Sequence, residues 1–183
     1  MTDLVTERLV LRPFTPGDLP AFVAYRRDAA VARYQSWDTS FSRADAETFL
    51  AEQRALAFGQ RGAWVQIAAA DRATGELCGD CAVKVLDEQP ATAEVGVTIA
   101  PAHQGAGLAG EALGAVVARL FAELGLHRVV AETDDRNAGI HRVLERLGFR
   151  CEARLVEADW FKEEWVTLRT FALLRREWEA QRR

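Results

Sequence analysis

Between Val95 and Gly110 the chain reads V-G-V-T-I-A-P-A-H-Q-G-A-G-L-A-G. The β-branched run at its start is typical of a strand and stops at Pro101, and three glycines then lead into an alanine-rich segment typical of a helix. Glycine lets backbone N–H groups approach a ligand closely, and a helix start adds unpaired donors and a partial positive charge. The segment therefore predicts a turn that binds a phosphate or pyrophosphate.

The composition predicts one globular domain over residues 1–183, because 49% of the residues are hydrophobic and glycine and proline are few. The formal net charge of -4 argues against a nucleic-acid partner, since such domains are usually basic. No stretch approaches the roughly 20 apolar residues of a membrane span, and the N-terminus lacks the pattern of a signal peptide. We therefore expect a cytoplasmic protein with neither a nucleic-acid nor a membrane partner.

The three cysteines, Cys78, Cys81 and Cys151, are expected to be reduced thiols. Cys78 and Cys81 form a C-x-x-C pattern inside an alternating run that predicts a strand. In a regular strand a spacing of three places two side chains on opposite faces, where they cannot share a metal. The three histidines also lack ligand spacing, so we expect no metal site.

Hydrophobic periodicity predicts the order of the elements. The expected strands cover residues 6–13, 63–71, 76–87, 93–100, 128–133, 149–156 and 165–174. The expected helices cover residues 16–27, 42–56, 107–124 and 136–147, with Ser42 as an N-cap. Short turns between residues 63 and 100 predict antiparallel hairpins, whereas the strand–helix–strand unit over 93–133 predicts one right-handed parallel crossover.

The glycine turn admits two interpretations. Residues 105–110 satisfy G-x-G-x-x-G, and Glu132 and Asp134 follow about twenty residues on, where a dinucleotide-binding fold has its ribose-binding acid. This interpretation predicts a nicotinamide-dependent oxidoreductase. Against it, residues 101–104 separate the strand from the first glycine, and the upstream segments predict hairpins in place of a βαβ series.

The second interpretation reads residues 104–109 as Q-x-x-G-x-A, and here the chain resembles the GNAT superfamily of acyl-CoA N-acyltransferases. Further segments of the resemblance follow in order along nearly the whole chain: T-E-R-L-V-L-R-P at 6–13, G-E-L-C-G-D at 75–80, E-V-G at 94–96, and Asn137 followed by G-F at 148–149. With the strand at 165–174 and E-W at 177–178, the pattern is similar to the Rim-type branch of ribosomal-protein N-acetyltransferases.

The resemblance implies an α/β (α+β) fold with a mixed, mostly antiparallel sheet of six to seven strands, splayed at the central parallel pair and flanked by about four helices. It implies transfer of an acetyl group from acetyl-CoA to a primary amine, such as a protein N-terminal α-amino group or a small-molecule amine. The pantetheine arm would lie against the backbone of Val97, Thr98 and Ile99, and Asn137 would contact that arm or the thioester end. The pyrophosphate would be held by the N–H groups of Gln104, Gly105, Ala106, Gly107, Leu108 and Ala109.

An amine must lose a proton before it attacks a thioester, so a carboxylate base is expected. Glu94 opens the central strand, and Asp159 aligns with the proposed catalytic carboxylate of the Rim-type branch; both are candidates. A backbone N–H near Val97 would stabilise the oxyanion.

The usual proton donors to the leaving thiolate are missing, because Leu144 stands at the family's tyrosine position and Ile140 at its serine position. A non-catalytic acyl-CoA-binding regulatory module is therefore an alternative.

Acceptor recognition is expected from the N-terminal helices, residues 34–38 and the last hairpin, which surround the thioester end in similar folds. Trp37, Phe41, Trp160 and Phe161 could line that cleft. Exposed hydrophobic residues on the last hairpin could also support a homodimer.

Overall fold

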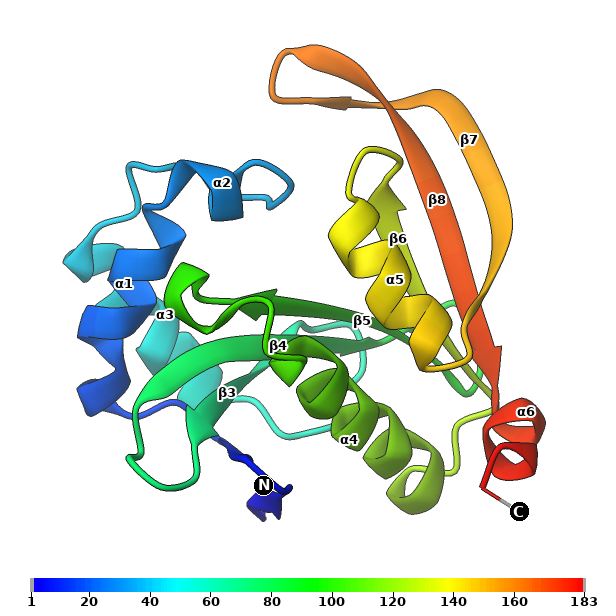
Figure 1. The fold of residues 1–183 in the computed structure, drawn as a ribbon, viewed down its shortest axis with the longest axis horizontal. Helices are drawn as coiled ribbons and strands as arrows, with labels where there is room; N and C mark the ends of the chain where they lie inside the picture. Colours follow the sequence, from blue (N-terminus) through cyan, green and yellow to red (C-terminus); the bar gives the residue numbers. More distant parts are fainter. Residues whose placement is uncertain (1, 183) are drawn as a thin grey trace.

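The computed structural model describes residues 2–182 (Figure 1). The strands within this range are β1 (Leu4–Val5), β2 (Leu9–Arg12), β3 (Val65–Asp71), β4 (Leu77–Val85), β5 (Thr92–Ile99), β6 (Arg128–Asp134), β7 (Arg150–Phe161) and β8 (Glu164–Leu174). The α-helices are α1 (Leu19–Arg26), α2 (Ala29–Ala32), α3 (Arg43–Arg54), α4 (Leu108–Glu123), α5 (Ala138–Arg146) and α6 (Arg175–Ala180). Short 3-10 turns, η1 (Pro16–Asp18) and η2 (Pro101–His103), precede α1 and the glycine turn.

All strands form one mixed sheet in the order β1-β2-β3-β4-β5-β6-β8-β7, and its only parallel pair in residues 2–182 is β5 with β6. The expected fold class and the parallel crossover are confirmed. The sheet has eight strands, more than the six to seven expected, because the short β1 also pairs with β2.

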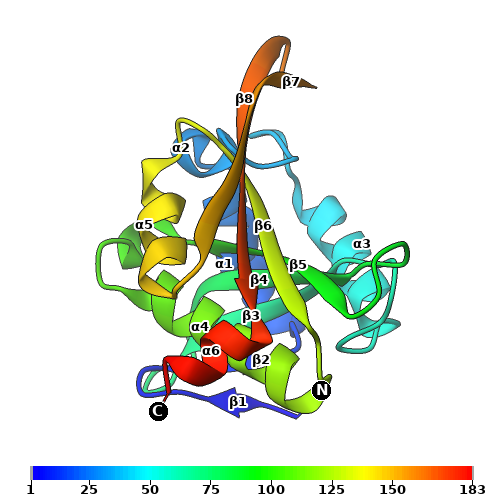
Figure 2. The same ribbon diagram turned by 90° about the vertical axis from the view of Figure 1, so that its right-hand side faces the viewer.

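The parallel pair separates soon after it begins. β5 pairs with β6 only from Thr92 to Glu94, opposite Arg128 to Val130. Beyond this point β5 continues along β4, while β6 continues along β8 (Figure 2). The expected splay is therefore confirmed, and the backbone edge of β5 after Glu94 is left without a strand partner on the β6 side.

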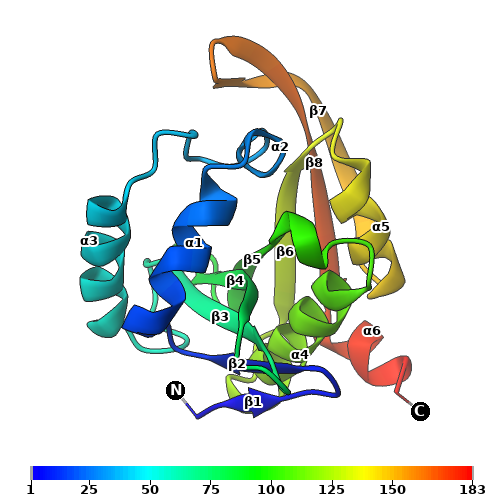
Figure 3. The same cartoon turned by 60° about the vertical axis from the view of Figure 1, so that its left-hand side comes forward.

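Helices cover both faces of the sheet, with α1 and α3 on one side and α4 and α5 on the other (Figure 3). Each side has its own core: Phe22 and Leu50 belong to a cluster with Ala68 of β3, whereas the buried face of α4 packs with Leu144 and with Phe171 of β8. The hairpin of β7 and β8 extends beyond the rest of the sheet (Figure 1).

The expected helix starts are confirmed to within three residues, the largest difference being at α1, where residues 16–18 form the 3-10 turn η1. Ser42 caps α3, since its hydroxyl accepts a hydrogen bond from the Asp45 N–H, and Asn137 caps α5 by accepting from the Ile140 N–H. Two apolar residues lie outside the buried helix faces that the periodicity indicates. Leu124, expected as the last residue of its helix, lies past the end of α4 and is 37% exposed. In α5, His141 and Leu144 are buried, while Ile140 is only partly buried.

The prediction that Cys78 and Cys81 lie on opposite faces was wrong. Both thiols belong to the core cluster that contains the buried face of α4. The register between β3 and β4 shifts between Ala69 and Ala70, and this β-bulge resets the alternation of β4. Burial raises the pKa of both thiols. Among residues 2–182, no group of three or more His, Cys, Asp or Glu side chains is placed to hold a metal ion.

The hairpin tip carries exposed apolar side chains, including Trp160 at 58% and Trp165 at 59% exposure. Homodimerisation through this hairpin stays a prediction. The longest helix of the described chain, α4, has 16 residues, and none of the helices there combines the length and apolar character needed to cross a bilayer.

Candidate active site

A groove of about 610 Å³, here called the outer groove, runs between the glycine turn and the start of α5. It is lined by nearly all of the residues expected to hold the donor: Val97, Thr98, Ile99, Gln104, Gly105, Gly107, Leu108, Ala109 and Asn137. Ala106 is the exception. Its carbonyl oxygen instead accepts a hydrogen bond of 2.7 Å from Arg8, whose Nε is 2.7 Å from Glu111 of α4. This contact ties the turn to the N-terminal segment.

The glycine turn presents unpaired N–H groups to the outer groove. Gly105 and Gly107 have φ of 78° and 81°, which favours glycine and turns the chain into α4. Within residues 2–182, the N–H groups from Gly105 to Gly110 donate no hydrogen bond to the protein. The Gln104 N–H was expected to hold the pyrophosphate, but it donates to the Pro101 carbonyl oxygen. The side-chain amide of Gln104 donates to the Ile99 carbonyl oxygen at 2.8 Å. Gln104 therefore shapes the turn.

Sequence reasoning missed two cationic residues of the outer groove. Arg142 and Arg146 of α5 lie along the wall opposite the glycine turn. They are four residues apart on one helix face, so the spacing was visible in the sequence, but only the packing of α5 shows that this face borders the groove. The unpaired N–H groups and the two guanidinium groups together make the groove suitable for a phosphorylated ligand.

The gap between β5 and β6 holds a second cavity of about 200 Å³, here called the inner cavity. Tyr34, Val97, Asn137 and Ile140 line both this cavity and the outer groove, so the two spaces meet at these residues. Leu144 is fully buried on the wall of the inner cavity. α5 therefore offers no hydroxyl group at the two positions where the resemblance places tyrosine or serine.

Tyr34 belongs to the segment 34–38 that was expected near the thioester end for acceptor recognition, but its hydroxyl was not expected to serve the leaving thiolate. It precedes β5 by a long stretch of chain, yet it lines both the outer groove and the inner cavity, and its hydroxyl is 3.4 Å from the Arg136 carbonyl oxygen. This position results from the packing of the segment around α2 against the loop before α5.

A third space of about 390 Å³, here called the side cavity, lies on the α1 and α3 face of the sheet. Gln35, Val95, Gly96, Val97 and Glu132 line both the side cavity and the inner cavity, so these spaces meet across β5. The outer groove, the inner cavity and the side cavity therefore adjoin one another at β5.

The structure separates the two expected base candidates. Glu94 lines the side cavity together with Glu132 and Asp80, and burial, then the Glu132 charge, raises its pKa against the opposing effect of Lys84. Asp159 lies on exposed β7, opposite Val166, and lines the inner cavity. Glu94 therefore faces the side cavity, and Asp159 faces the inner cavity.

The acids expected for a nicotinamide site are not placed for that role. Neither Glu132 nor Asp134 lines the outer groove. Glu132 faces the inner and side cavities, and Asp134 is paired with Arg136 at 2.6 Å. The glycine pattern therefore lacks its acidic partner, and the dinucleotide interpretation was wrong.

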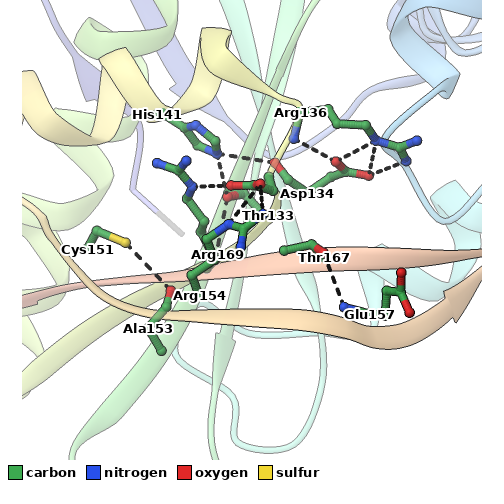
Figure 4. Close-up of polar contacts among 11 residues, drawn as sticks. Thr133, Asp134, Arg136, His141, Cys151, Ala153, Arg154, Glu157, Thr167 and Arg169 are labelled. Carbon is green, nitrogen blue, oxygen red and sulfur yellow. Dashed lines mark hydrogen bonds and ion pairs between the residues drawn. The ribbon is translucent and has the colours of Figure 1, made fainter.

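A polar network holds the loop that delivers Asn137 to the site (Figure 4). Asp134 accepts hydrogen bonds from the N–H and guanidinium of Arg136, while Arg154 and Arg169 bind Asp135 and lower its pKa to about 2. His141 Nε2 lies 3.1 Å from the Thr133 hydroxyl, and burial lowers the pKa of this imidazole. These contacts join β6, the loop, α5 and the last hairpin.

Comparisons with known proteins agree with the fold and with the phosphate-binding character of the outer groove. Residues 8–150 match the family model described as an acetyltransferase (GNAT) domain. The chain is 27% identical to the uncharacterized N-acetyltransferase p20 of Bacillus licheniformis over 179 residues, 97% of this chain and 99% of that protein. It is 32% identical to the uncharacterized N-acetyltransferase YoaA of Bacillus subtilis (strain 168) over 152 residues, 83% of this chain and 85% of that protein.

Solved structures give the same result. A GNAT-family acetyltransferase from Bacillus anthracis superimposes with a TM-score of 0.83 at 26% identity, covering 96% of this chain and 100% of that one. Two more distant structures share the fold. They are the spermidine N-acetyltransferase of Vibrio cholerae with CoA and spermine (TM-score 0.80, 21% identity, 95% and 99% covered) and RimL, a ribosomal L7/L12 α-N-protein acetyltransferase with CoA (TM-score 0.80, 18% identity, 94% and 98% covered).

The chain belongs to the GNAT acetyltransferase family. It is accordingly an acyl-CoA N-acetyltransferase. The resemblance to the Rim-type branch is supported by a relative named a putative ribosomal N-acetyltransferase, YdaF of Bacillus subtilis (strain 168), which is 32% identical over 108 residues, 59% of each chain.

Proposed function

We propose that this enzyme binds acetyl-CoA in the outer groove and acetylates a primary amine that enters from the side cavity. The observation that carries the proposal is that these two spaces and the inner cavity share lining residues at the splayed strands β5 and β6, with Val97 on the wall of all three. Donor and acceptor would thus approach from opposite faces of the sheet and meet beside Val97.

The residues of the outer groove fit the donor. The unpaired N–H groups from Gly105 to Ala109 would hold the pyrophosphate, with Arg142 and Arg146 adding positive charge. The edge of β5 at Val97, Thr98 and Ile99 has no strand partner on the β6 side, and there it would hydrogen-bond the pantetheine arm as a neighbouring strand would, apart from the Ile99 carbonyl that Gln104 already bonds. The thioester supplies an activated acetyl group.

Glu94 is the base we propose for the amine proton. An α-amino group with an ordinary pKa of about 7.7 to 8 arrives mostly protonated, and a carboxylate with a raised pKa accepts a proton more readily. Glu132 would add attraction for the ammonium ion. Asp159 is the second candidate, because it lines the inner cavity where the reacting groups would meet.

The remaining steps fall to groups around the inner cavity. The N–H of Val97 would stabilise the developing oxyanion, and Asn137 would contact the donor near its thioester end. As the nitrogen–carbon bond forms and the carbon–sulfur bond breaks, Glu94 takes the amine proton and the Tyr34 hydroxyl donates a proton to the leaving sulfur. Tyr34 thereby replaces the hydroxyl that Leu144 and Ile140 do not supply.

The acceptor we propose is a primary amine on a protein N-terminus or a small molecule, which agrees with the acceptors named for the RimL and spermidine acetyltransferase structures. We also propose a cytoplasmic location, because acetyl-CoA is an intracellular substrate, and chemistry without a resident metal.

The test is calorimetric titration of the protein with acetyl-CoA and, in parallel, with NAD, followed by amine-dependent release of free thiol. Binding of acetyl-CoA with thiol release supports the proposal. Binding without release from any amine would favour the non-catalytic module, and binding of NAD alone would contradict the family function. Glu94→Gln and Asp159→Asn then identify the base, because the true base variant loses turnover while keeping its affinity for acetyl-CoA.

A further inference from the structure

Three polar atoms on the wall of the side cavity have no partner in the protein. Within residues 2–182, the buried side-chain nitrogen and oxygen atoms without a hydrogen bond are Arg26 Nε, Trp37 Nε1 and Gln66 Oε1. All three residues line the side cavity. Buried polar groups are normally hydrogen-bonded, so a cluster of unpaired ones at a cavity indicates a missing ligand group. Two of these atoms are donors and one is an acceptor.

Arg26 is the charged member of this set and is only 7% exposed. Its guanidinium carbon lies 3.8 Å from the centre of the Trp37 ring and 4.3 Å from that of Phe22, and Phe41 and Phe49 are further neighbours. Aromatic faces favour a cation but accept no hydrogen bond in the plane of the guanidinium. The planar donor fork of Arg26 is therefore held in a fixed direction.

Asp80 lines the same cavity as Arg26, but the two side chains form no direct hydrogen bond or ion pair. One oxygen of Asp80 instead accepts a hydrogen bond of 2.5 Å from the Tyr25 hydroxyl. Burial lowers the pKa of Arg26, and the Asp80 carboxylate and the Tyr25 side chain oppose that effect. Asp80 thus stabilises the Arg26 charge without satisfying its Nε–H group, which a carboxylate from a ligand could bind directly.

We propose that the side cavity selects an amine acceptor that also carries a carboxylate, a small zwitterion of the amino-acid type. Its carboxylate would accept hydrogen bonds from Arg26 and Trp37, and its amino group would face Glu94 and Glu132. This inference rests on the proposed function and names the class of acceptor for the same site.

The charges and the volume of the side cavity favour this class over others. One arginine, Arg26, and three carboxylates, those of Asp80, Glu94 and Glu132, line this space of about 390 Å³. Glu94 and Glu132 would attract the amino group, and the unpaired N–H groups of Arg26 and Trp37 would bind the carboxylate of the same compact molecule. A polyamine would offer no hydrogen-bond acceptor to these two N–H groups and would add positive charge beside Arg26. A peptide N-terminus would offer a neutral carbonyl in place of the carboxylate.

The test compares acceptors that differ in one group. Thiol release is measured for amino acids with the amine one to four carbons from the carboxylate, each against its primary amide and its decarboxylated amine. We expect the wild-type enzyme to favour at least one amino acid over its two matched amines by about 10- to 100-fold in kcat/KM, the effect of a charge-assisted hydrogen bond.

Arg26→Gln is expected to abolish most of this preference, mainly through KM. Arg43→Gln is the matched control, because this exposed arginine pairs with Glu47 on α3 and does not line the cavity. Trp37→Phe keeps a ring over Arg26 while removing Nε1–H, and should reduce the preference more mildly. This variant also tests the proposal if Arg26→Gln fails to fold.

Three outcomes would overturn the inference. Equal rates for every amino acid and its matched amines would show that the enzyme does not recognise a carboxylate. Equal rates for amino acid and amide, both above the amine, would show recognition of a neutral carbonyl, as in a peptide. A parallel loss for all acceptors in Arg26→Gln and no change in Trp37→Phe would make Arg26 structural. Absence of thiol release with every amine would instead contradict the proposed function.

Discussion

Glu94 and Glu132 lie on the neighbouring parallel strands β5 and β6, and both line the side cavity, so burial and the Glu132 charge together raise the pKa of Glu94. The pair arises where the strands begin to separate, since Glu94 is the last residue of β5 paired to β6. A raised pKa and an open cavity are the properties expected of a general base.

The Glu94 pKa should appear in the pH dependence of kcat/KM. Activity requires the deprotonated carboxylate, so it should rise with pH through the Glu94 pKa. Glu132→Gln removes a negative charge and lowers the pKa of Glu94. The rise in kcat/KM on the acidic side of the pH profile, here called the acidic limb, should therefore move to lower pH. Glu94→Gln should lower kcat by about 10²- to 10⁴-fold and eliminate the limb. Unchanged turnover in Glu94→Gln together with lost turnover in Asp159→Asn would assign the base to Asp159.

Comparison of Gly105→Ala with Gly75→Ala should separate the loss of acetyl-CoA binding from the loss of stability caused by backbone strain. An added Cβ would meet no atom within 4 Å at Gly105 or at Gly75, and their φ values are 78° and 77°. Each alanine variant should therefore lose a similar free energy of unfolding, about 1–2 kcal/mol. Only Gly105→Ala should weaken acetyl-CoA binding, by about tenfold in calorimetry. Equal affinities in the two variants would argue against an anion site at the turn.

Tyr34→Phe should slow the step in which the thiolate leaves. The ring remains between the outer groove and the inner cavity, so acetyl-CoA affinity should change little, whereas kcat should fall by about 10²-fold. Calorimetry measures the acetyl-CoA affinity, and rapid-mixing measurement of thiol release at saturating substrates measures the slower step. An unchanged kcat would show that water protonates the sulfur.

Asp18→Asn should destabilise the fold in a pH-dependent way. Asp18 is 4% exposed and accepts hydrogen bonds of 2.7 Å from Arg12 and from the Thr15 N–H. Burial alone would raise the pKa of Asp18, but these bonds lower it below its ordinary value. The stabilisation is therefore present above the unfolded-state pKa and is lost as pH falls through the lower folded-state pKa.

We expect Asp18→Asn to lose about 3 kcal/mol at pH 7, since removal of one partner leaves a buried group unpaired. Urea unfolding of the variant and wild type at pH 7 and at low pH measures the difference, which should narrow in acid. A constant difference across pH would show that Asp18 acts through packing alone.

The sequence by itself determined the local structure and the family. The Ser42 cap, the hairpins between β3 and β5, and the turn through Gly105 and Gly107 depend on neighbours along the chain, and all were predicted. Periodicity also predicted the crossover from β5 to β6, because a right-handed connection leaves few alternatives.

Only the tertiary structure decided which distant groups share a space. The bulge beside Ala69 places Cys78 and Cys81 in one core. The segment around α2 brings Tyr34 to the wall shared by the outer groove and the inner cavity. Packing of α1 holds Arg26 beside Trp37 at the side cavity, which Glu94 also lines. Such contacts join residues with no fixed spacing in the chain. Their positions depend on how whole elements pack, and local sequence patterns do not encode this.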